Sequence, residues 1–272
     1  MILGDYHTHT AYCDGKASPE EMLLAAIDKG LEFYGFSSHS HLPYDEDWNM
    51  SHQAQEQYIA EVNSLKKKYA SKISVLLGTE CDLYSDNTLN EFDYVIGSCH
   101  CLIKDGQYLS IDHSADTYLS VVNSVYSGDH YAFVQDYFET ISTAATRDEF
   151  TFYGHFDLIN KFNQNSVFFD EADPRYTEPM LCALQKLAKS GKPLELNTKH
   201  TFAHSAQEPS QSAHIWLSAL YEMGGNIIIN SDAHAPSRIA YNFEEATRFA
   251  KSCGFTRALA LTPSGIDEFH LR

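Results

Sequence analysis

Short apolar segments alternate with longer amphipathic segments along most of the chain. The apolar segments are rich in β-branched and aromatic residues and end in polar residues, a pattern typical of buried strands. The predicted strands are residues 4–9, 33–39, 73–80, 94–100, 150–155, 193–197 and 226–234. Strands that alternate with helical segments indicate an α/β protein with a parallel sheet.

The amphipathic segments carry signals for the start and the end of helices. Ser18 precedes Pro19 and stands three residues before Glu21, which together predict a capping box with proline at the first helical position. Asp173 followed by proline is a second start signal, and Gly254 is a stop signal. The other predicted helices cover residues 52–69, 116–146, 174–190, 211–223 and 237–252.

The number of strand–helix units suggests the architecture. Seven such units in one chain, with no low-complexity linker between them, favour a closed barrel over two separate domains. We therefore expect a single domain over residues 1–272, folded as a distorted (β/α)7 TIM-like barrel. An open doubly wound sheet is the alternative, because the sequence does not define the order of the strands.

Composition and charge narrow the classes of function. The 272-residue chain has a formal net charge of −18, and its one run of basic residues is the short KKK at 66–68. A nucleic-acid surface is normally basic, so we expect no nucleic-acid partner. The six cysteines form no CxxC pair, and neither a signal-peptide pattern nor an apolar run of roughly 18 residues is present. We therefore expect a cytoplasmic protein with no membrane partner.

Residues able to bind a metal ion stand at the ends of six of the seven predicted strands. They are His7, His9, His39, Glu80, His100, His155, Asp232 and His234. The carboxyl ends of the strands of a β/α barrel meet at one mouth, and side chains two apart on a strand point the same way. Glu80 and Asp232 would be costly to bury among imidazoles without a cation. The pattern predicts a metal centre.

The chain resembles the PHP (polymerase and histidinol phosphatase) superfamily of metal-dependent phosphoesterases. The pieces that match, in the superfamily's order, are HTHTAYCDG at 7–15, SSHS at 37–40, GTE at 78–80, SCH at 98–100, GHFDLI at 154–159 and SDAH at 231–234. The resemblance implies the PHP fold, a distorted barrel of seven β/α units with three metal ions at its mouth.

The resemblance also implies a ligand set. One metal ion would be held by His7, His9 and Asp232. Glu80 would bridge to a second ion, which His100 and His155 complete. A third ion would be held by Asp14, His39 and His234. Imidazole and carboxylate ligands suit zinc, iron or manganese, so we expect two to three divalent transition metal ions of these kinds.

Length and motifs are most similar to the histidinol-phosphate phosphatases within the superfamily. That similarity implies hydrolysis of a small phosphorylated metabolite, L-histidinol phosphate, to L-histidinol and phosphate in histidine biosynthesis. The expected attacking group is a hydroxide shared by two metal ions. Glu80, Asp232 and Asp14 are the expected catalytic residues, and Asp14, Asp232 and His200 are the conceivable proton donors for the leaving group.

The segments expected to bind the phosphate depart from those of the relatives. Where the relatives often carry NTxGLR after the sixth strand, this chain has NTKHTFAHS, and after His155 it has only Lys161 where relatives carry adjacent basic residues. Lys199, Lys161 and Arg238 are the expected replacements, and His200 is expected at the mouth.

Three other functions fit the same sequence. A phosphatase of phosphotyrosine proteins and an enzyme acting on nucleotides or as an exonuclease could both use this scaffold. A metal-binding regulatory protein without catalysis would need a defective site, yet all nine expected ligand positions are filled. The sequence does not indicate an oligomeric state.

Overall fold

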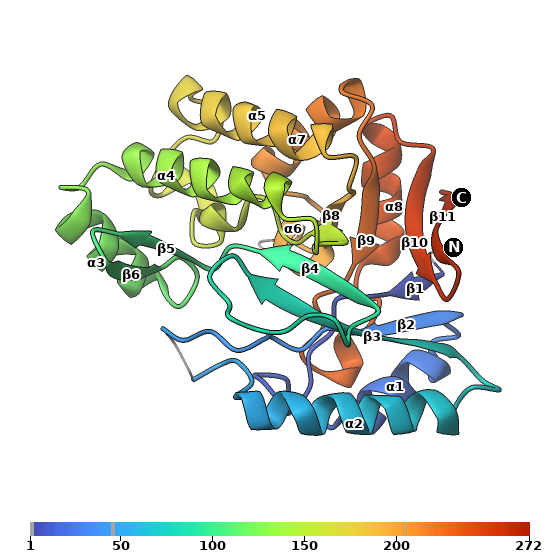
Figure 1. Ribbon diagram of the computed structural model, residues 1–272. Helices are drawn as coiled ribbons and strands as arrows, with labels where there is room; N and C mark the ends of the chain where they lie inside the picture. The colour runs from blue at the N-terminus through green and yellow to red at the C-terminus, as the bar shows by residue number, and fades with distance from the viewer. Residues whose placement is uncertain (1–2, 45–46, 204) are drawn as a thin grey trace.

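The computed structural model describes residues 3–44, 47–203 and 205–272, in which nine strands form one sheet and two more form a hairpin (Figure 1). The strands of the sheet are β1 (Gly4–Asp5), β2 (Phe33–Phe36), β3 (Ser74–Asp82), β4 (Tyr94–Ser98), β7 (Phe152–Tyr153), β8 (Leu194–Asn197), β9 (Ile227–Asn230), β10 (Arg257–Thr262) and β11 (Gly265–His270). Each of the seven predicted strand segments contains a strand. The hairpin of β5 (Cys101–Lys104) and β6 (Gln107–Ser110), together with β10 and β11, was not predicted.

The strands follow one another across the sheet in chain order. Neighbours from β1 to β10 are parallel, and only β11 runs antiparallel to its neighbour, β10. The order never reverses, so a doubly wound sheet is excluded. The sheet curls until the segments after its first and seventh strands meet, where Thr8 and Ala233 form a parallel bridge and His9 N donates to Ala233 O at 2.8 Å.

The α-helices in the described ranges are α1 (Pro19–Asp28), α2 (His52–Lys68), α3 (Ala115–Val125), α4 (His130–Ser142), α5 (Pro174–Lys189), α6 (Thr198–Thr201), α7 (Gln211–Glu222) and α8 (Phe243–Ser252). The longer helices pack around the outside of the curled sheet, whereas the one-turn α6 follows β8 at the carboxyl ends of the strands. Figure 1 shows α2 along one side of the sheet and α4 and α5 on the opposite side. No helix in the described ranges is long and apolar enough to cross a bilayer.

The predicted capping box is present, whereas two of the predicted helices differ from those in the structure. Ser18 Oγ accepts from Glu21 N, and Ser18 N donates to the Glu21 carboxylate at 2.9 Å. The predicted helix 116–146 is wrong, because Ser127 and Gly128 both have positive φ and separate α3 from α4. The predicted helix 237–252 begins late, since a 3₁₀ turn at Pro236–Arg238 precedes α8.

The inside of the curl is filled by a small apolar cluster that supports the strand ends. Its buried members are Tyr6, Leu76, Tyr94, Ile96, Phe152, Ile228, Ala260 and Leu261. The Tyr94 hydroxyl donates to the carbonyls of Tyr6 and Phe36 at 2.6 and 2.8 Å. A Cβ at Gly35 or Gly78 would lie within 2.5 Å of the Tyr94 ring or hydroxyl, so these glycines provide the space for it. This apolar cluster packs the inside of the curled sheet.

Candidate metal centre and active site

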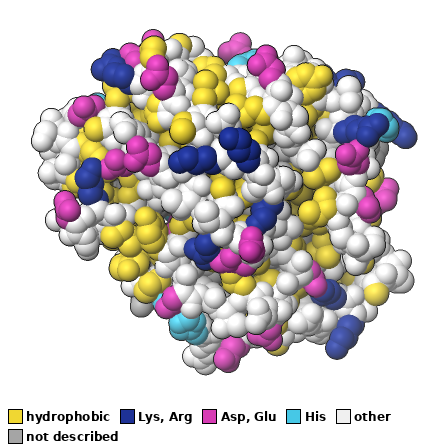
Figure 2. Space-filling model, turned by 45° about the horizontal axis from the view of Figure 1, so that its top comes forward, with side chains coloured by type: hydrophobic (Ala, Val, Ile, Leu, Met, Phe, Trp, Pro, Cys, Tyr) yellow, Lys and Arg dark blue, Asp and Glu magenta, His cyan; other side chains and the backbone are white. Residues whose placement is uncertain are grey.

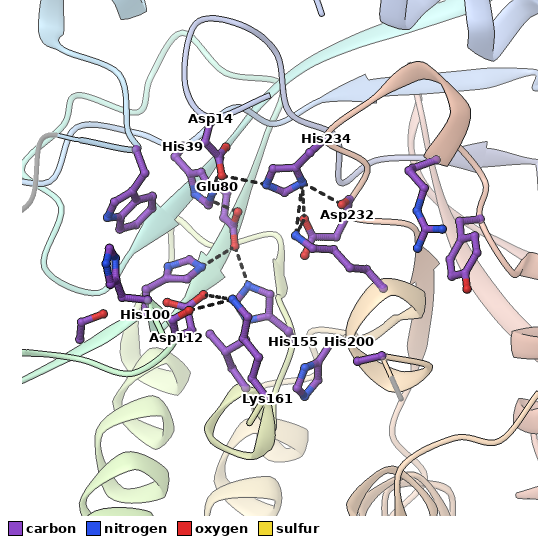
Figure 3. A pocket seen from close by; sticks show the side chains of 18 of the residues that line it. Asp14, His39, Glu80, His100, Asp112, His155, Lys161, His200, Asp232 and His234 are labelled. Atoms are coloured by element: carbon purple, nitrogen blue, oxygen red, sulfur yellow. Dashed lines mark hydrogen bonds and ion pairs between the residues drawn. The ribbon is translucent and has the colours of Figure 1, made fainter. Parts of the chain in front are cut away.

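The nine predicted metal ligands lie together at the carboxyl ends of the strands. Figure 3 shows those that line the cavity, which are Asp14, His39, Glu80, His100, His155, Asp232 and His234. Among the described residues, four groups near this end bring their ligand atoms within 4.8 Å of one another. The groups are His7, His9 and Asp232; His7, Glu80 and His155; His39, Glu80 and His100; and His9, Asp14, His39 and His234. The curled sheet therefore brings together side chains that are up to 227 positions apart in the sequence.

Glu80 is the centre of this arrangement. It lies in β3, and its side chain is 1% exposed. One carboxylate oxygen lies 2.9 Å from His7 Nε2 and 3.0 Å from His39 Nδ1. The other oxygen lies 2.9 Å from His155 Nε2 and 3.3 Å from His100 Nε2. His9 Nε2 is a third neighbour of the first oxygen, at 3.4 Å. The two oxygens thus face different sets of imidazoles, which is the placement that a bridging carboxylate requires.

Asp14 and Asp232 occupy the part of the cluster nearest the opening. Asp232 Oδ1 lies 3.2 Å from His9 Nε2, and Asp14 Oδ2 lies 3.0 Å from His234 Nε2. The Asp14 side chain is 35% exposed, whereas that of Asp232 is 10% exposed. Asp232 has a φ of 51°, a left-handed conformation that costs energy in a residue other than glycine. This conformation is held between the end of β9 and the loop that follows it, in which the amides of Ser231 and Ala240 are hydrogen-bonded.

The donor atoms fit bound cations. His9 Nε2 is buried and makes no hydrogen bond, although Asp232 and Glu80 oxygens lie within 3.4 Å of it. Burial lowers the pKa of His9 to about 4, so this imidazole is neutral at pH 7. Burial raises the pKa of Glu80, but the charges of His7 and His39 outweigh it and hold that pKa well below its usual value. Neutral imidazole and ionised carboxylate are the forms that bind metal ions.

Glu195 on β8 supports the cluster from behind, and the sequence analysis did not select it. Its carboxylate lies 2.8 Å from His7 Nδ1 and accepts from His155 N at 3.0 Å. Asn197 and Asn230 also donate to it, at 3.0 and 2.9 Å. Such a partner fixes the ring orientation of a metal-binding histidine. The available signal was the spacing, since Glu195 is two residues before Asn197 and therefore on the same face of the strand.

Asp5 on β1 holds the loop that carries Asp232. Its buried carboxylate accepts from Ser231 N at 3.0 Å, from the Ser231 hydroxyl and from Ala240 N at 2.9 Å. Burial raises the pKa of Asp5 to about 6, despite the hydrogen bonds that it accepts. These contacts join both ends of the segment between Ser231 and Ala240, which also contains Arg238.

The cluster opens into a cavity of about 510 Å³. Its lining includes Asp14, Glu80 and Asp232 at the cluster, and the four residues predicted to contact substrate, which are Lys161, Lys199, His200 and Arg238. Trp48 also lines it, with its ring 4.6 Å from that of His39. Figure 2 shows acidic and basic side chains interspersed on one face of the molecule, with no continuous basic patch.

The predicted substrate-binding residues differ in their partners. Lys161 Nζ lies 3.0 Å from the Asp112 carboxylate, and Lys199 Nζ lies 3.2 Å from Asp232 Oδ1. The guanidinium of Arg238 lies over the Tyr241 ring, 3.5 Å from its centroid, and it forms no ion pair with a residue in the described part of the chain.

His200 is buried and held by Asp157. Its Nε2 lies 3.0 Å from the Asp157 carbonyl and 3.3 Å from the Asp157 carboxylate. His204, in the same NTKHTFAHS segment, lies outside the described residues. His200 therefore lines the mouth, as predicted, in an orientation fixed by an acidic partner.

Known proteins share both the sequence pattern and the fold. The pattern of the PHP domain family matches residues 5–199. A probable histidinol-phosphatase of Deinococcus radiodurans is 29% identical over 266 residues, covering 93% of this chain and 94% of the relative. The structure of a candidate histidinol phosphatase from Listeria monocytogenes has a TM-score of 0.73 and 25% identity, covering 87% of this chain and 97% of the other.

A second solved structure is that of histidinol phosphate phosphatase from Lactococcus lactis in complex with zinc, L-histidinol and phosphate. Its TM-score is 0.70 at 21% identity, and the match covers 97% of this chain and 98% of that one. At this identity the likeness concerns the fold, an α/β fold with a curled sheet.

Proposed function

The chain belongs to the PHP domain family, and from this membership we propose that it is a metal-dependent phosphomonoesterase that hydrolyses L-histidinol phosphate to L-histidinol and phosphate. The observation that carries the proposal is the set of nine ligand-type side chains around Glu80, open to a cavity of about 510 Å³. A cavity of this size suits a small metabolite. The relatives from Deinococcus and Lactococcus, which are named for this activity, support the choice of substrate.

The proposal includes the architecture and the metal content. The seven parallel strands from β1 to β9 would be the seven units of a distorted (β/α)7 barrel, in one domain spanning residues 1–272, with β10 and β11 added at one edge. The groups of ligands would hold three divalent ions of zinc, manganese or iron. Glu80 would be the ligand shared between two of them, since its two oxygens face different imidazoles.

The bound ions would offset the charge of the phosphate and lower the pKa of a water molecule, which makes a nucleophile available at neutral pH. The chain's own part is to hold the donors in place before substrate arrives. Glu195 orients the imidazole of His7 through a contact with the Nδ1 of that ring, and Asp5 fixes the Ser231 backbone beside Asp232. Such a preorganised site lowers the reorganisation needed as charge develops on the phosphate.

Arg238 is the residue that we assign to the substrate phosphate. A guanidinium can donate two parallel hydrogen bonds to phosphate oxygens, and the Tyr241 ring holds this one in orientation. Lys161 and Lys199 already face the carboxylates of Asp112 and Asp232, which offset part of their charge. Their contribution to phosphate binding should therefore be smaller.

The leaving alkoxide of histidinol needs a proton, and His200 is the donor that we assign. Although burial raises the pKa of Asp14, the hydrogen bond with His234 and the electrostatic effect of the neighbouring imidazoles outweigh it and lower that pKa far below its usual value. The pKa of Asp232 is likewise well below its usual value, because Lys199 and His7 outweigh its burial. Neither carboxyl therefore holds a proton at neutral pH, which leaves His200, the imidazole that lines the cavity beside Asp157, as the assigned donor.

The test is a measurement of phosphate release from L-histidinol phosphate, a phosphotyrosine peptide and a nucleoside monophosphate, with zinc, manganese and iron supplied separately. We expect the highest kcat/KM for L-histidinol phosphate, and two to three ions per chain by metal analysis. Faster hydrolysis of the phosphotyrosine peptide would overturn the assigned substrate and keep the reaction type. No hydrolysis of any phosphomonoester by metal-loaded protein would overturn the function itself.

A further inference from the structure

A second cluster of histidine and carboxylate lies outside the cavity. It consists of His41, His52 and Asp86, and none of the three is among the side chains that line the cavity. Their ligand atoms lie within 4.8 Å of one another. The imidazole rings of His41 and His52 are side by side, with centroids 4.1 Å apart and planes 31° apart. The three side chains come from the segment after β2, the first position of α2 and the segment after β3.

Asp86 joins the two imidazoles through one oxygen. Asp86 Oδ1 is hydrogen-bonded to His41 Nδ1 at 2.8 Å and lies 3.9 Å from His52 Nε2. The longer distance exceeds that of a hydrogen bond, so His52 is close to this oxygen without being bonded to it. Two ligands of a tetrahedral zinc ion lie about 3.3 Å apart, because each is about 2.0–2.2 Å from the metal. The two observed separations lie on either side of that value, so small side-chain shifts would suffice.

Neighbouring hydrogen bonds hold the two segments of the cluster in register. Ser40 and Ser85, the residues before His41 and Asp86, are joined by a hydroxyl–hydroxyl hydrogen bond of 2.9 Å. The residue after Asp86, Asn87, donates to the His41 carbonyl at 2.9 Å. The backbone positions of both ligands are therefore fixed from each side.

The third ligand, His52, is fixed by its helix. It is the first residue of the 17-residue helix α2, and the side chain of the preceding residue, Ser51, accepts from Ala54 N at 3.2 Å. Hydrogen bonds thus hold the backbone of His41 and Asp86, and the helix holds that of His52. Metal sites need their ligands held in place by such surrounding contacts.

We propose that His41, His52 and Asp86 form a peripheral site for one divalent transition metal ion such as zinc, with water completing the coordination. The side chains of His52 and Asp86 are 62% and 52% exposed, so the ion would exchange more readily than ions in the buried centre. It would join the ends of the segment that contains Trp48, a residue lining the cavity. The site does not depend on the proposed phosphatase activity.

The experiment compares zinc content and zinc affinity in the full, metal-loaded protein. Wild type, His52→Ala and His270→Ala are dialysed against buffered zinc and analysed for zinc per chain, and calorimetric titration with zinc gives the affinity of the weakest site. His270 is exposed on β11 and serves as the matched control. We expect one zinc ion fewer per chain in His52→Ala, wild-type content in His270→Ala, and at least tenfold weaker affinity in Asp86→Asn.

Equal zinc content in wild type and His52→Ala, with no change in the titration, would overturn the proposal. A combined variant separates this outcome from failure of the main centre. Glu80→Ala should lose ions of the buried centre, and adding His52→Ala should remove one further zinc ion. If the protein proves inactive on every phosphomonoester while the His52-dependent ion is present, the peripheral site stands and the proposed function fails.

Discussion

The floor and the wall of the cavity are built in different ways. The floor, defined as Glu80 and the eight other ligand-type residues, lies at the carboxyl ends of the parallel strands, and all of its members except Asp14 stand within four residues of a strand end. The wall, defined as Lys161, Lys199 and Arg238, stands on the segments that follow the strands, and two of its three cations face carboxylates. Residues at strand ends therefore define the position of the reaction centre. The ion-pair partners of the loop residues determine which cations remain available to bind the substrate.

The largest expected effect comes from removing the centre of the floor. Glu80→Ala should lower kcat/KM by at least about 10³-fold, because it removes both oxygens that face five imidazoles and leaves a buried cationic cluster without its main counter-charge. The measurement is phosphate release together with metal content per chain. Glu91→Ala, at an exposed position, is the control. Activity close to wild type in Glu80→Ala would mean that the floor is not the reaction centre.

The members of the floor and of the wall could be predicted from the sequence, but the partners of the wall residues could not. The ligands repeat one signal, a histidine or carboxylate at the end of an apolar segment, and the parallel sheet then brings them together. The state of Lys161 depends on Asp112, which is 49 positions away in a segment with no recognisable pattern. Arg238 was selected only as a nearby cation, and its stacking on Tyr241 depends on the turn before α8.

The fold could likewise be predicted only in part. Seven of the nine strands of the sheet were predicted, because these buried strands carry an apolar pattern. The break between α3 and α4 was not predicted, because it depends on the positive φ of Ser127 and Gly128 within an otherwise helical pattern. The exposed β11 carries little apolar signal, and its pairing with β10 depends on tertiary structure. Glu195 was missed for a related reason, because a lone glutamate in a strand does not show which histidine it will meet.

A second prediction concerns Asp5, which supports floor and wall together. The folded carboxyl keeps its proton up to about pH 6, whereas an unfolded one loses it near pH 3.8. Between these two pH values the folded state binds more protons than the unfolded state. The contribution of Asp5 to stability is therefore full below about pH 3.8 and is lost as the pH rises through about 6. The difference in unfolding free energy between wild type and Asp5→Asn should fall by about 2–3 kcal/mol from pH 4 to pH 7.

Chemical denaturation at several pH values measures this difference. The absolute stability of Asp5→Asn does not decide the result, because an amide cannot accept all the hydrogen bonds from Ser231 and Ala240. Only the change with pH counts. A difference that is constant across this pH range would show that folding does not raise the pKa of Asp5.

A third prediction separates the ligands of the floor from their support. Glu195→Gln should weaken metal binding by about 10–100-fold, the usual effect of removing a carboxylate that orients a ligand histidine. The amide can still contact His7 but carries no charge, so excess metal should restore most of the activity. Metal affinity and activity against metal concentration are the measurements. Activity that stays lost at saturating metal would place Glu195 among the groups that act on the substrate.

The smallest expected effects distinguish the cations of the wall. Arg238→Ala should raise KM for L-histidinol phosphate by about 10–30-fold, because it removes a charged donor worth about 1.5–2 kcal/mol that faces no carboxylate in the described part of the chain. Lys161→Ala should raise KM only a few-fold, since the Asp112 carboxylate offsets much of the lysine charge. Steady-state kinetics of both variants, with Arg238→Lys as the conservative partner, give the comparison. A larger effect of Lys161→Ala than of Arg238→Ala would mean that the Lys161–Asp112 pair opens when substrate binds. The ion pairs of the substrate-free protein would then not indicate which cation contributes most to phosphate binding.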